Sequence, residues 1–241
     1  MSQQMSVFYV LEGIKLLTKP GIKKFVIMPL VLNILLFGGL LLLSSHYYHL
    51  LSHWLTQHLP HWLAWLTWIL WTLFFAGFFI VFIYAFTTLS NLIAAPFNSL
   101  LSEKVEFYLT GELQPNRSLS QNVADIPRVI GRQLGILGYY LPRAFILLVL
   151  FFVPVVQVVA AVFWFLFNAW FMTLQYVDYP ADNHRVSLSA MRMKIKEKRL
   201  DSLGFGVGVL LLSMIPILNF LVMPAAIAGA TKLWIDKLRN S

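Results

Sequence analysis

The sequence contains no cysteine and few charged residues for its length. Only 12% of its 241 residues are Asp, Glu, Lys or Arg, whereas a soluble domain carries about 25%. Without cysteine, disulfide bonds and thiolate metal sites are excluded. Charged residues are missing from Phe25 through Ser102 and between Asp201 and Lys232. A membrane span needs only about 20 apolar residues, so these runs predict an integral membrane protein and not a soluble core.

Three common catalytic patterns are also absent. The chain has no nucleotide-binding loop G-x-x-x-x-G-K-[ST], no metalloprotease H-E-x-x-H and no hydrolase G-x-S-x-G. We therefore expect no enzyme activity, no cofactor and no resident metal. The net charge is +8, but the basic residues flank apolar runs and form no single exposed face. This distribution argues against nucleic-acid binding and favours membrane lipid as a partner.

The apolar runs and their breaks predict an all-α integral membrane protein, organised as one membrane domain over residues 1–241. Apolar residues at helical spacing predict an interfacial amphipathic helix over 7–19, which Pro20 and Gly21 end. Two long transmembrane helices are predicted over 22–59 and 62–97, with the second ending inside at Pro96-Phe97-Asn98. A helix of 36 residues is about 54 Å long, against about 30 Å of hydrocarbon, so each should cross the bilayer and project beyond it.

The rest of the chain is predicted as two proline-broken, partly penetrating helical hairpins separated by polar segments. In chain order these are a cytoplasmic amphipathic region over 98–133, a hairpin over 134–177, a basic cytoplasmic segment over 178–202 and a re-entrant hairpin over 203–231. Pro154 should break the first hairpin, whose arms of about 20 residues are long enough to span. Pro216 and Pro224 should break the second, whose arms are too short. The basic termini and polar segments are predicted to be cytoplasmic by the positive-inside rule.

The most informative polar stretch is Gly21-Ile22-Lys23-Lys24. Glycine allows a tight turn, and the following residues open a helix whose first N–H groups and positive dipole end favour an anion. With two ammonium groups beside them, these four residues form a candidate oxyanion site. The alternative is that Lys23 and Lys24 only anchor the helix at the membrane surface.

Other polar residues could line a solute path or couple it to protons. Glu103 and Glu106 share a helical face and could exchange protons, or they lie on a solvated cytoplasmic helix. Arg128 precedes Arg132 by four residues. Arg143 is the only formal charge from 134 to 177, so it either faces protein or a cavity or extends to the interface. The remaining pore candidates are the amides Asn33, Asn91, Asn98 and Asn219.

Three histidines, His46, His49 and His53, are spaced so that they share a helical face. Imidazoles at this spacing could hold zinc. No carboxylate is near them in the sequence to orient the rings. We therefore favour an ordinary polar face on a helix that extends outward.

Five segments together resemble the CysZ-type sulfate permease family. They are Thr18-Lys-Pro-Gly-Ile-Lys-Lys-Phe-Val-Ile-Met-Pro-Leu-Val-Leu-Asn33, Ile93-Ala-Ala-Pro-Phe-Asn-Ser-Leu-Leu101, Tyr140-Leu-Pro-Arg143, Gln175-Tyr-Val-Asp-Tyr-Pro-Ala-Asp-Asn-His184 and Ile215-Pro-Ile-Leu-Asn219. The resemblance runs in order along nearly the whole chain. It implies a homo-oligomer that imports sulfate across the bacterial inner membrane for cysteine biosynthesis, with sulfate bound at Gly21, Ile22, Lys23 and Lys24. The family loop commonly has arginines where this chain has lysines, which keep the charge but lack the bidentate fork.

Two other functions remain open from the sequence. One is a non-transporting membrane scaffold that docks a cytoplasmic partner through the basic segment. The other is a membrane enzyme, which the missing catalytic patterns disfavour.

Overall fold

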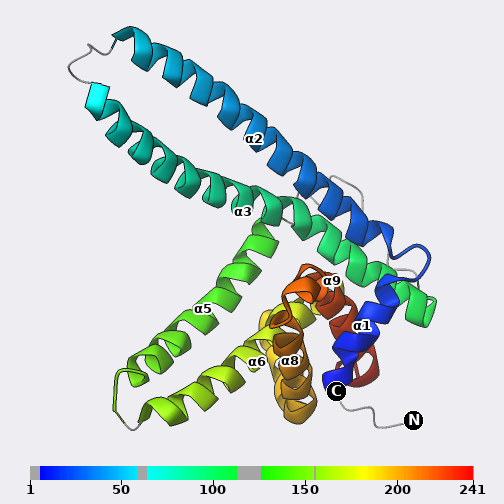
Figure 1. Ribbon diagram of the computed structural model, residues 1–241. Coiled ribbons are helices and arrows are strands. Elements are labelled where there is room, and N and C mark those ends of the chain that lie inside the picture. The colour runs from blue at the N-terminus through cyan, green and yellow to red at the C-terminus, as the bar shows by residue number, and fades with distance from the viewer. Residues whose placement is uncertain (1–5, 59–63, 113–125, 155, 241) are drawn as a thin grey trace. The chain divides into compact units, whose positions relative to one another are not determined.

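A computed structural model describes residues 6–58, 64–112, 126–154 and 156–240, which form helices and turns without a β-strand in those ranges. Four helices in these ranges are long and apolar enough to cross a membrane, which confirms the prediction of an all-α integral membrane protein. The chain divides into two compact units (Figure 1). We call residues Phe25–Phe97 the helical pair, and Met1–Lys24 together with Asn98–Ser241 the packed unit.

The helical pair is built from α2 (Lys24–His58) and the first part of α3 (Ala64–Thr110). Phe37 packs against Phe82 with ring centroids 5.5 Å apart, and Tyr48 packs against Trp71 at 4.6 Å. A later residue of α2 thus meets an earlier residue of α3, so the two helices are antiparallel, as Figure 1 shows. Both long helices were predicted, and α2 begins two residues later than expected.

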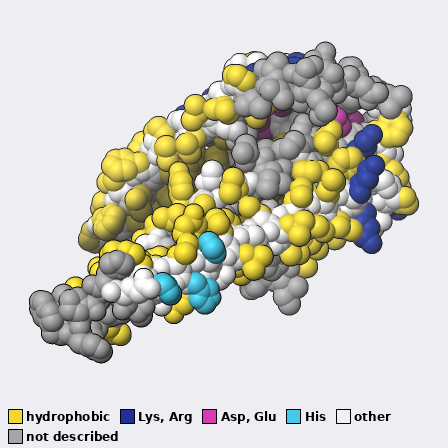
Figure 2. All heavy atoms as spheres, turned by 90° about the horizontal axis from the view of Figure 1, so that it is seen from above, with side chains coloured by type: hydrophobic (Ala, Val, Ile, Leu, Met, Phe, Trp, Pro, Cys, Tyr) yellow, Lys and Arg dark blue, Asp and Glu magenta, His cyan; other side chains and the backbone are white. Residues whose placement is uncertain are grey.

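The side chains of the helical pair are mostly hydrophobic and mostly exposed. The most apolar windows of Lys24–Trp54 and Trp68–Leu89 contain no buried residue. Figure 2 shows hydrophobic side chains covering much of the visible face, interrupted by a group of histidines. Large apolar surfaces of this kind are not stable in water, which is the physical reason to place these helices in lipid.

One predicted boundary is wrong, because α3 does not end at Pro96-Phe97-Asn98. It continues to Thr110 and carries the second part of its length into the packed unit. There Leu101 and Val105 are fully buried, together with the polar residues Asn98, Ser102 and Glu106. Tertiary packing therefore stabilises the extra turns of α3, despite the proline at position 96 of the sequence.

The packed unit contains the other helices. They are η1 (Ser6–Phe8), α1 (Tyr9–Leu17), α5 (Ile126–Leu150), α6 (Val156–Asn183), α7 (Leu188–Glu197), α8 (Arg199–Ser213), α9 (Pro216–Leu233) and the π-helical turn η3 (Trp234–Leu238). The predicted break near Pro154 separates α5 from α6, and the predicted break at Pro216 separates α8 from α9. Pro224 lies inside α9 and breaks nothing, so that part of the prediction is wrong. Insertion of these helices as membrane hairpins stays a prediction.

The core of the packed unit is centred on α9, where Ala225 through Ala228 are fully buried. Small residues allow neighbouring helices to pack against α9 and α8 with their backbones in contact. A Cβ atom on Gly13 of α1 would overlap the carbonyl oxygen of Ala225, and one on Gly206 of α8 would overlap that of Ala169 on α6. Such close approach maximises dispersion contacts between the helices.

The N-terminal helix α1 has apolar residues on more than one face. Phe8 and Leu11 are both 42% exposed. Tyr9, Val10, Gly13, Leu16 and Leu17 are buried, and α1 packs against α9. The helix therefore has two apolar faces, of which one is buried in protein and the other is available to the membrane interface.

Ion pairs connect the N-terminal segment to the end of the chain. Asp201 accepts hydrogen bonds from Ser6 and Lys237, and the Tyr9 hydroxyl donates to Asp236 at 3.1 Å. Burial opposes ionisation of Asp201, but the bonds from Lys237 and Ser6 outweigh it and hold the pKa of this carboxyl below its usual value. Burial, and then the nearby Asp236 carboxylate, raise the pKa of the Tyr9 hydroxyl above its usual value.

The close contact at Gly206 can be tested with two alanine substitutions. We expect Gly206→Ala to lower the free energy of unfolding by about 2–3 kcal/mol, because the added methyl group forces α8 away from α6. Gly131→Ala on α5 is the matched control, since a Cβ there meets nothing within 4 Å. Reversible unfolding of the detergent-solubilised protein measures both changes. Equal stability of the two variants would contradict the packing described for α8.

Candidate functional site

The candidate oxyanion site predicted from the sequence lies at a turn over residues 20–23, just before helix α2. Gly21 has φ of 85°, in the left-handed region that favours glycine. Helix α2 begins at Lys24, so its positive dipole end lies at this turn. The side chains of Lys23 and Lys24 are exposed, whereas Ile22 is 2% exposed and anchors the turn in the packed unit.

The backbone N–H groups of this turn are less open than the sequence suggested. Ile22 N and Lys23 N donate to the Lys19 carbonyl at 3.2 and 3.4 Å. An oxyanion that used these two amides would have to compete with that carbonyl, and the longer Lys23 bond is the easier one to replace. The two ammonium groups are therefore the main attraction for an anion at this turn, and the amides are secondary.

A second polar feature lies along the part of α3 that enters the packed unit. Asn98, Ser102 and Glu106 are spaced four residues apart on one helix face, and we call them the α3 polar stripe. All three are buried, with Ser102 and Glu106 fully so. Asn98 donates to the Tyr179 hydroxyl at 3.3 Å, and the Ser102 hydroxyl lies 2.9 Å from that of Thr231. The stripe thus joins α3 to α6 and α9 by hydrogen bonds.

Glu106 is the chemically most distinctive member of the stripe. Its carboxylate lies 2.7 Å from His184 Nε2 and 3.7 Å from the Arg239 guanidinium. The His184 ring stacks on Trp234, with centroids 6.2 Å apart. Trp234 is buried, and its Nε1–H has no acceptor among the described residues. A buried carboxylate next to an imidazole can hold or pass a proton, and the indole N–H is a donor that could serve an anion.

The other predicted amide and glutamate candidates lie on α2, α3 and α9. Glu103 is half-buried on α3, beside the stripe. Asn33 belongs to the helical pair, and its Oδ1 is buried without a hydrogen-bond partner among the described residues. Asn91 and Asn219 lie on α3 and α9, but their side chains fall outside the described part of the structure. The structure therefore brings Asn98 and Glu106 onto one stripe.

Arg128 belongs to a compact ion-pair cluster between α5 and α6. It pairs with Asp182, while Arg132 pairs with Asp178 at 2.6 Å and donates to the Val186 carbonyl at 2.6 Å. The side chains of Arg132 and Asp178 are 8% and 6% exposed, so this pair is almost completely desolvated. Satisfied pairing of this kind indicates a structural clamp and leaves little capacity for a solute.

Arg143 has a different environment. It is exposed, lies with its guanidinium carbon 3.9 Å from the centre of the Tyr139 ring and donates to the Tyr139 carbonyl at 2.8 Å. It therefore faces neither a described cavity nor a carboxylate, and it extends along the surface of α5.

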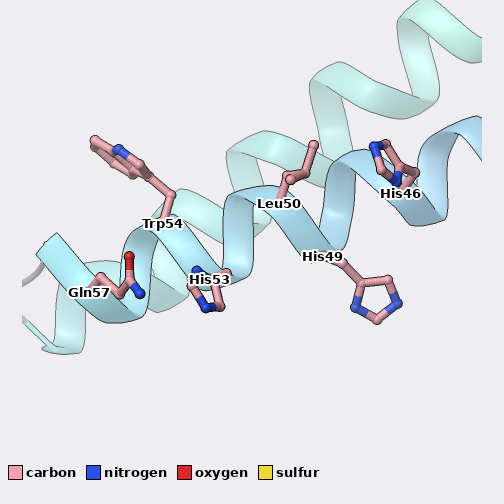
Figure 3. A pocket seen from close by; sticks show the side chains of 6 residues that line it. All are labelled: His46, His49, Leu50, His53, Trp54 and Gln57. Atoms are coloured by element: carbon pink, nitrogen blue, oxygen red, sulfur yellow. The ribbon is translucent and has the colours of Figure 1, made fainter.

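His46, His49 and His53 of α2 line a pocket with Leu50, Trp54 and Gln57 (Figure 3). In this view the rings of His46 and His49 project from different sides of the helix and do not converge. No group of three His, Cys, Asp or Glu side chains in the described ranges could hold a metal ion.

Sequence reasoning missed the partners of the two charged clusters. His184, Arg239, Asp178 and Asp182 were not among the predicted site residues. One signal was available. Arg128 and Arg132 are four residues apart, and so are Asp178 and Asp182. Each pair therefore lies on one face of its helix, and the opposite charges predict that the two faces meet. The four-residue spacing of the α3 polar stripe was a second signal, hidden by the expectation that the helix ended at Asn98.

The coupling of Glu106 to His184 can be measured by a double-mutant cycle. We expect Glu106→Gln and His184→Phe to show an interaction free energy of about 1–3 kcal/mol, because each substitution leaves the other side chain buried without its partner. Phenylalanine keeps the stacking on Trp234. The control cycle combines Glu112→Gln, at an exposed position, with His184→Phe. Its interaction free energy should be less than about 0.5 kcal/mol. A similar value from both cycles would show that the buried pair is not coupled.

Comparison with known proteins gives a consistent result along the chain. Residues 9–224 match a family model described as "Sulfate transporter CysZ/Etoposide-induced protein 2.4". A protein named sulfate transporter CysZ from Pectobacterium atrosepticum is 44% identical over 238 residues, which covers 97% of this chain and 86% of that protein. Proteins of the same name from Pseudomonas fluorescens and Pseudomonas syringae pv. tomato are 46% and 45% identical over 228 residues, covering 94% of this chain and 91% and 90% of theirs.

Proposed function

This chain belongs to the family of sulfate transporter CysZ and etoposide-induced protein 2.4, and from that membership we propose that it carries sulfate across a bacterial membrane. Relatives at 44–46% identity that cover most of the chain bear the name sulfate transporter, and this similarity is the observation that carries the proposal. Four helices that are long and apolar enough to cross a membrane support it.

We place the protein in the bacterial inner membrane as a multi-pass homo-oligomer with both termini in the cytoplasm. The excess of Lys and Arg in the termini and polar segments supports this orientation. The exposed apolar faces of the helical pair supply a surface for contacts between copies as well as for lipid. Sulfate delivered to the cytoplasm would supply cysteine biosynthesis.

Sulfate capture is assigned to Gly21, Ile22, Lys23 and Lys24. A dianion cannot enter hydrocarbon bare, because an unpaired charge there costs many kcal/mol. At this turn it would meet two exposed ammonium groups and the positive end of α2, while the buried Ile22 side chain keeps the turn in place. Each interaction stabilises a doubly negative ion, and none requires a metal.

Energetics requires a driving force for uptake. Moving two negative charges inward against about 100 mV costs roughly 4.6 kcal/mol. Consumption of sulfate in the cytoplasm can supply this free energy, and so can protons that travel with the ion. We assign proton coupling to Glu106 with His184, helped by Glu103. The full burial of Glu106 and its 2.7 Å contact with His184 support this assignment.

The path of the ion is assigned to neutral donors that follow the α3 polar stripe. Asn98 and Ser102 supply an amide and a hydroxyl, and the unpaired Nε1–H of Trp234 supplies a further donor in the same unit. Neutral donors can replace water around an anion without holding it too tightly for release. Asn33, Asn91 and Asn219 are the remaining candidates for contact with the ion. Arg128, which pairs with Asp182, and Arg143, which is exposed along α5, are not assigned to this path.

The capture site is tested by sulfate flux. We expect Lys23→Ala/Lys24→Ala to reduce uptake of radiolabelled sulfate into proteoliposomes by about tenfold or more, because two charge-assisted contacts are lost. Lys15→Ala/Lys19→Ala is the matched control, since it removes two exposed lysines from the same segment outside the four-residue turn. Lys23→Arg/Lys24→Arg should retain uptake and tighten sulfate binding through bidentate contacts.

Two outcomes would contradict this assignment in different ways. If both alanine variants transport like the original protein, the ion binds elsewhere. If the original protein itself gives no sulfate flux above empty liposomes, the transport proposal fails and a membrane scaffold becomes the better explanation.

Proton coupling is tested by imposing a pH gradient on the same proteoliposomes. An acidic exterior should raise the initial rate of sulfate uptake several-fold, because each co-transported proton offsets one negative charge. Glu106→Gln should keep uptake down a sulfate gradient but lose the response to pH, while Glu112→Gln serves as the control. An unchanged rate in the original protein would remove the coupling idea.

A further inference from the structure

One aromatic ring of the packed unit holds two guanidinium groups. The Tyr139 ring on α5 has the guanidinium carbon of Arg143 at 3.9 Å from its centre and that of Arg192 on α7 at 4.2 Å. Both contacts are close enough for cation–π attraction. The ring therefore concentrates two positive charges in a small volume, although they repel each other.

This pair differs from the other arginines of the same unit that form ion pairs. Arg128 and Arg132 pair with aspartates, and Arg239 pairs with Glu106 and Glu112. Within the described ranges, by contrast, no carboxylate lies within ion-pair distance of Arg143 or Arg192. Two cations held together without a counter-ion are a site that an anion would stabilise.

The position of the pair indicates which anion can reach it. Arg143 is exposed on α5, one of the helices that can cross a membrane. The basic helix α7 lies beside the preceding turns of α5, where Leu188 contacts Gly135. The exposed side chains of α5 near Arg143 are apolar on both sides of it, with Leu137 and Leu141 at 44% and 54% exposure and Phe145 and Ile146 at 66% and 59%. The pair thus lies beside an apolar surface of α5.

We propose that Arg143, Arg192 and Tyr139 form a binding site for the phosphate group of an anionic membrane phospholipid. The guanidinium forks match a tetrahedral oxyanion, with N–H···O contacts of about 2.8 Å, and the Tyr139 hydroxyl can add another donor. The acyl chains would lie along Phe145 and the apolar residues that follow. The lipid phosphate and free sulfate are both tetrahedral oxyanions. Only the lipid has acyl chains that can pack on this apolar surface.

The site is independent of the transport proposal and has its own test. Native mass spectrometry of the purified full chain in detergent, titrated with phosphatidylglycerol, measures the apparent affinity for the lipid. We expect Arg143→Gln/Arg192→Gln to weaken binding about tenfold, because two charge-assisted contacts are lost. Arg143→Lys/Arg192→Lys should bind with intermediate affinity, since lysine keeps the charge without the fork. Circular dichroism verifies that each variant is folded.

Two controls separate the possible sources of binding. Lys196→Gln/Arg199→Gln removes two exposed charges from α7 and the start of α8 and should leave the affinity within about twofold. Phosphatidylcholine, which has the same phosphate but no net charge, tests general lipid association. The proposal is overturned if the two double glutamine variants behave alike. It is also overturned if millimolar inorganic sulfate displaces the lipid, since the site would then prefer a free ion.

Discussion

A buried charge in this protein is tolerated only where another part of the chain supplies its partner. Glu106 is fully buried beside His184, and Arg132 is almost fully buried against Asp178. Burying either group without its partner would cost several kcal/mol. Because the partners come from segments far apart in the sequence, these pairs require α3, α5 and the C-terminal end of α6 to meet in one arrangement. The polar chemistry and the fold of the packed unit are therefore inseparable.

Small residues allow that arrangement to be compact. Gly13 and Gly206 bring α1 against α9 and α8 against α6 so closely that a methyl group would not fit. The helical pair has no comparable constraint, and a Cβ on Gly38, Gly39 or Gly77 would meet nothing. The helical pair and the packed unit differ because their surroundings differ. A surface that faces lipid needs only to be apolar, whereas a protein core must also be close-packed.

The cationic features of the molecule fall into two physical classes. Arg128, Arg132 and Arg239 are neutralised by carboxylates of the packed unit and stabilise its structure. Lys23 and Lys24 are exposed beside a helix start, and Arg143 shares a ring with Arg192. We propose that an anion from outside the chain, whether a solute or a lipid phosphate, binds at the second class and not at the first.

The sequence by itself determined the class of the protein, its long helices, the breaks at Pro154 and Pro216 and the glycine turn before Lys23 and Lys24. These properties depend on local composition and backbone geometry, which neighbouring residues specify. Only the tertiary structure decided that α3 continues to Thr110, that Pro224 lies within α9 and that Glu106 meets His184. Those outcomes depend on contacts between residues distant in the chain, where packing and the pairing of buried charge outweigh local propensity.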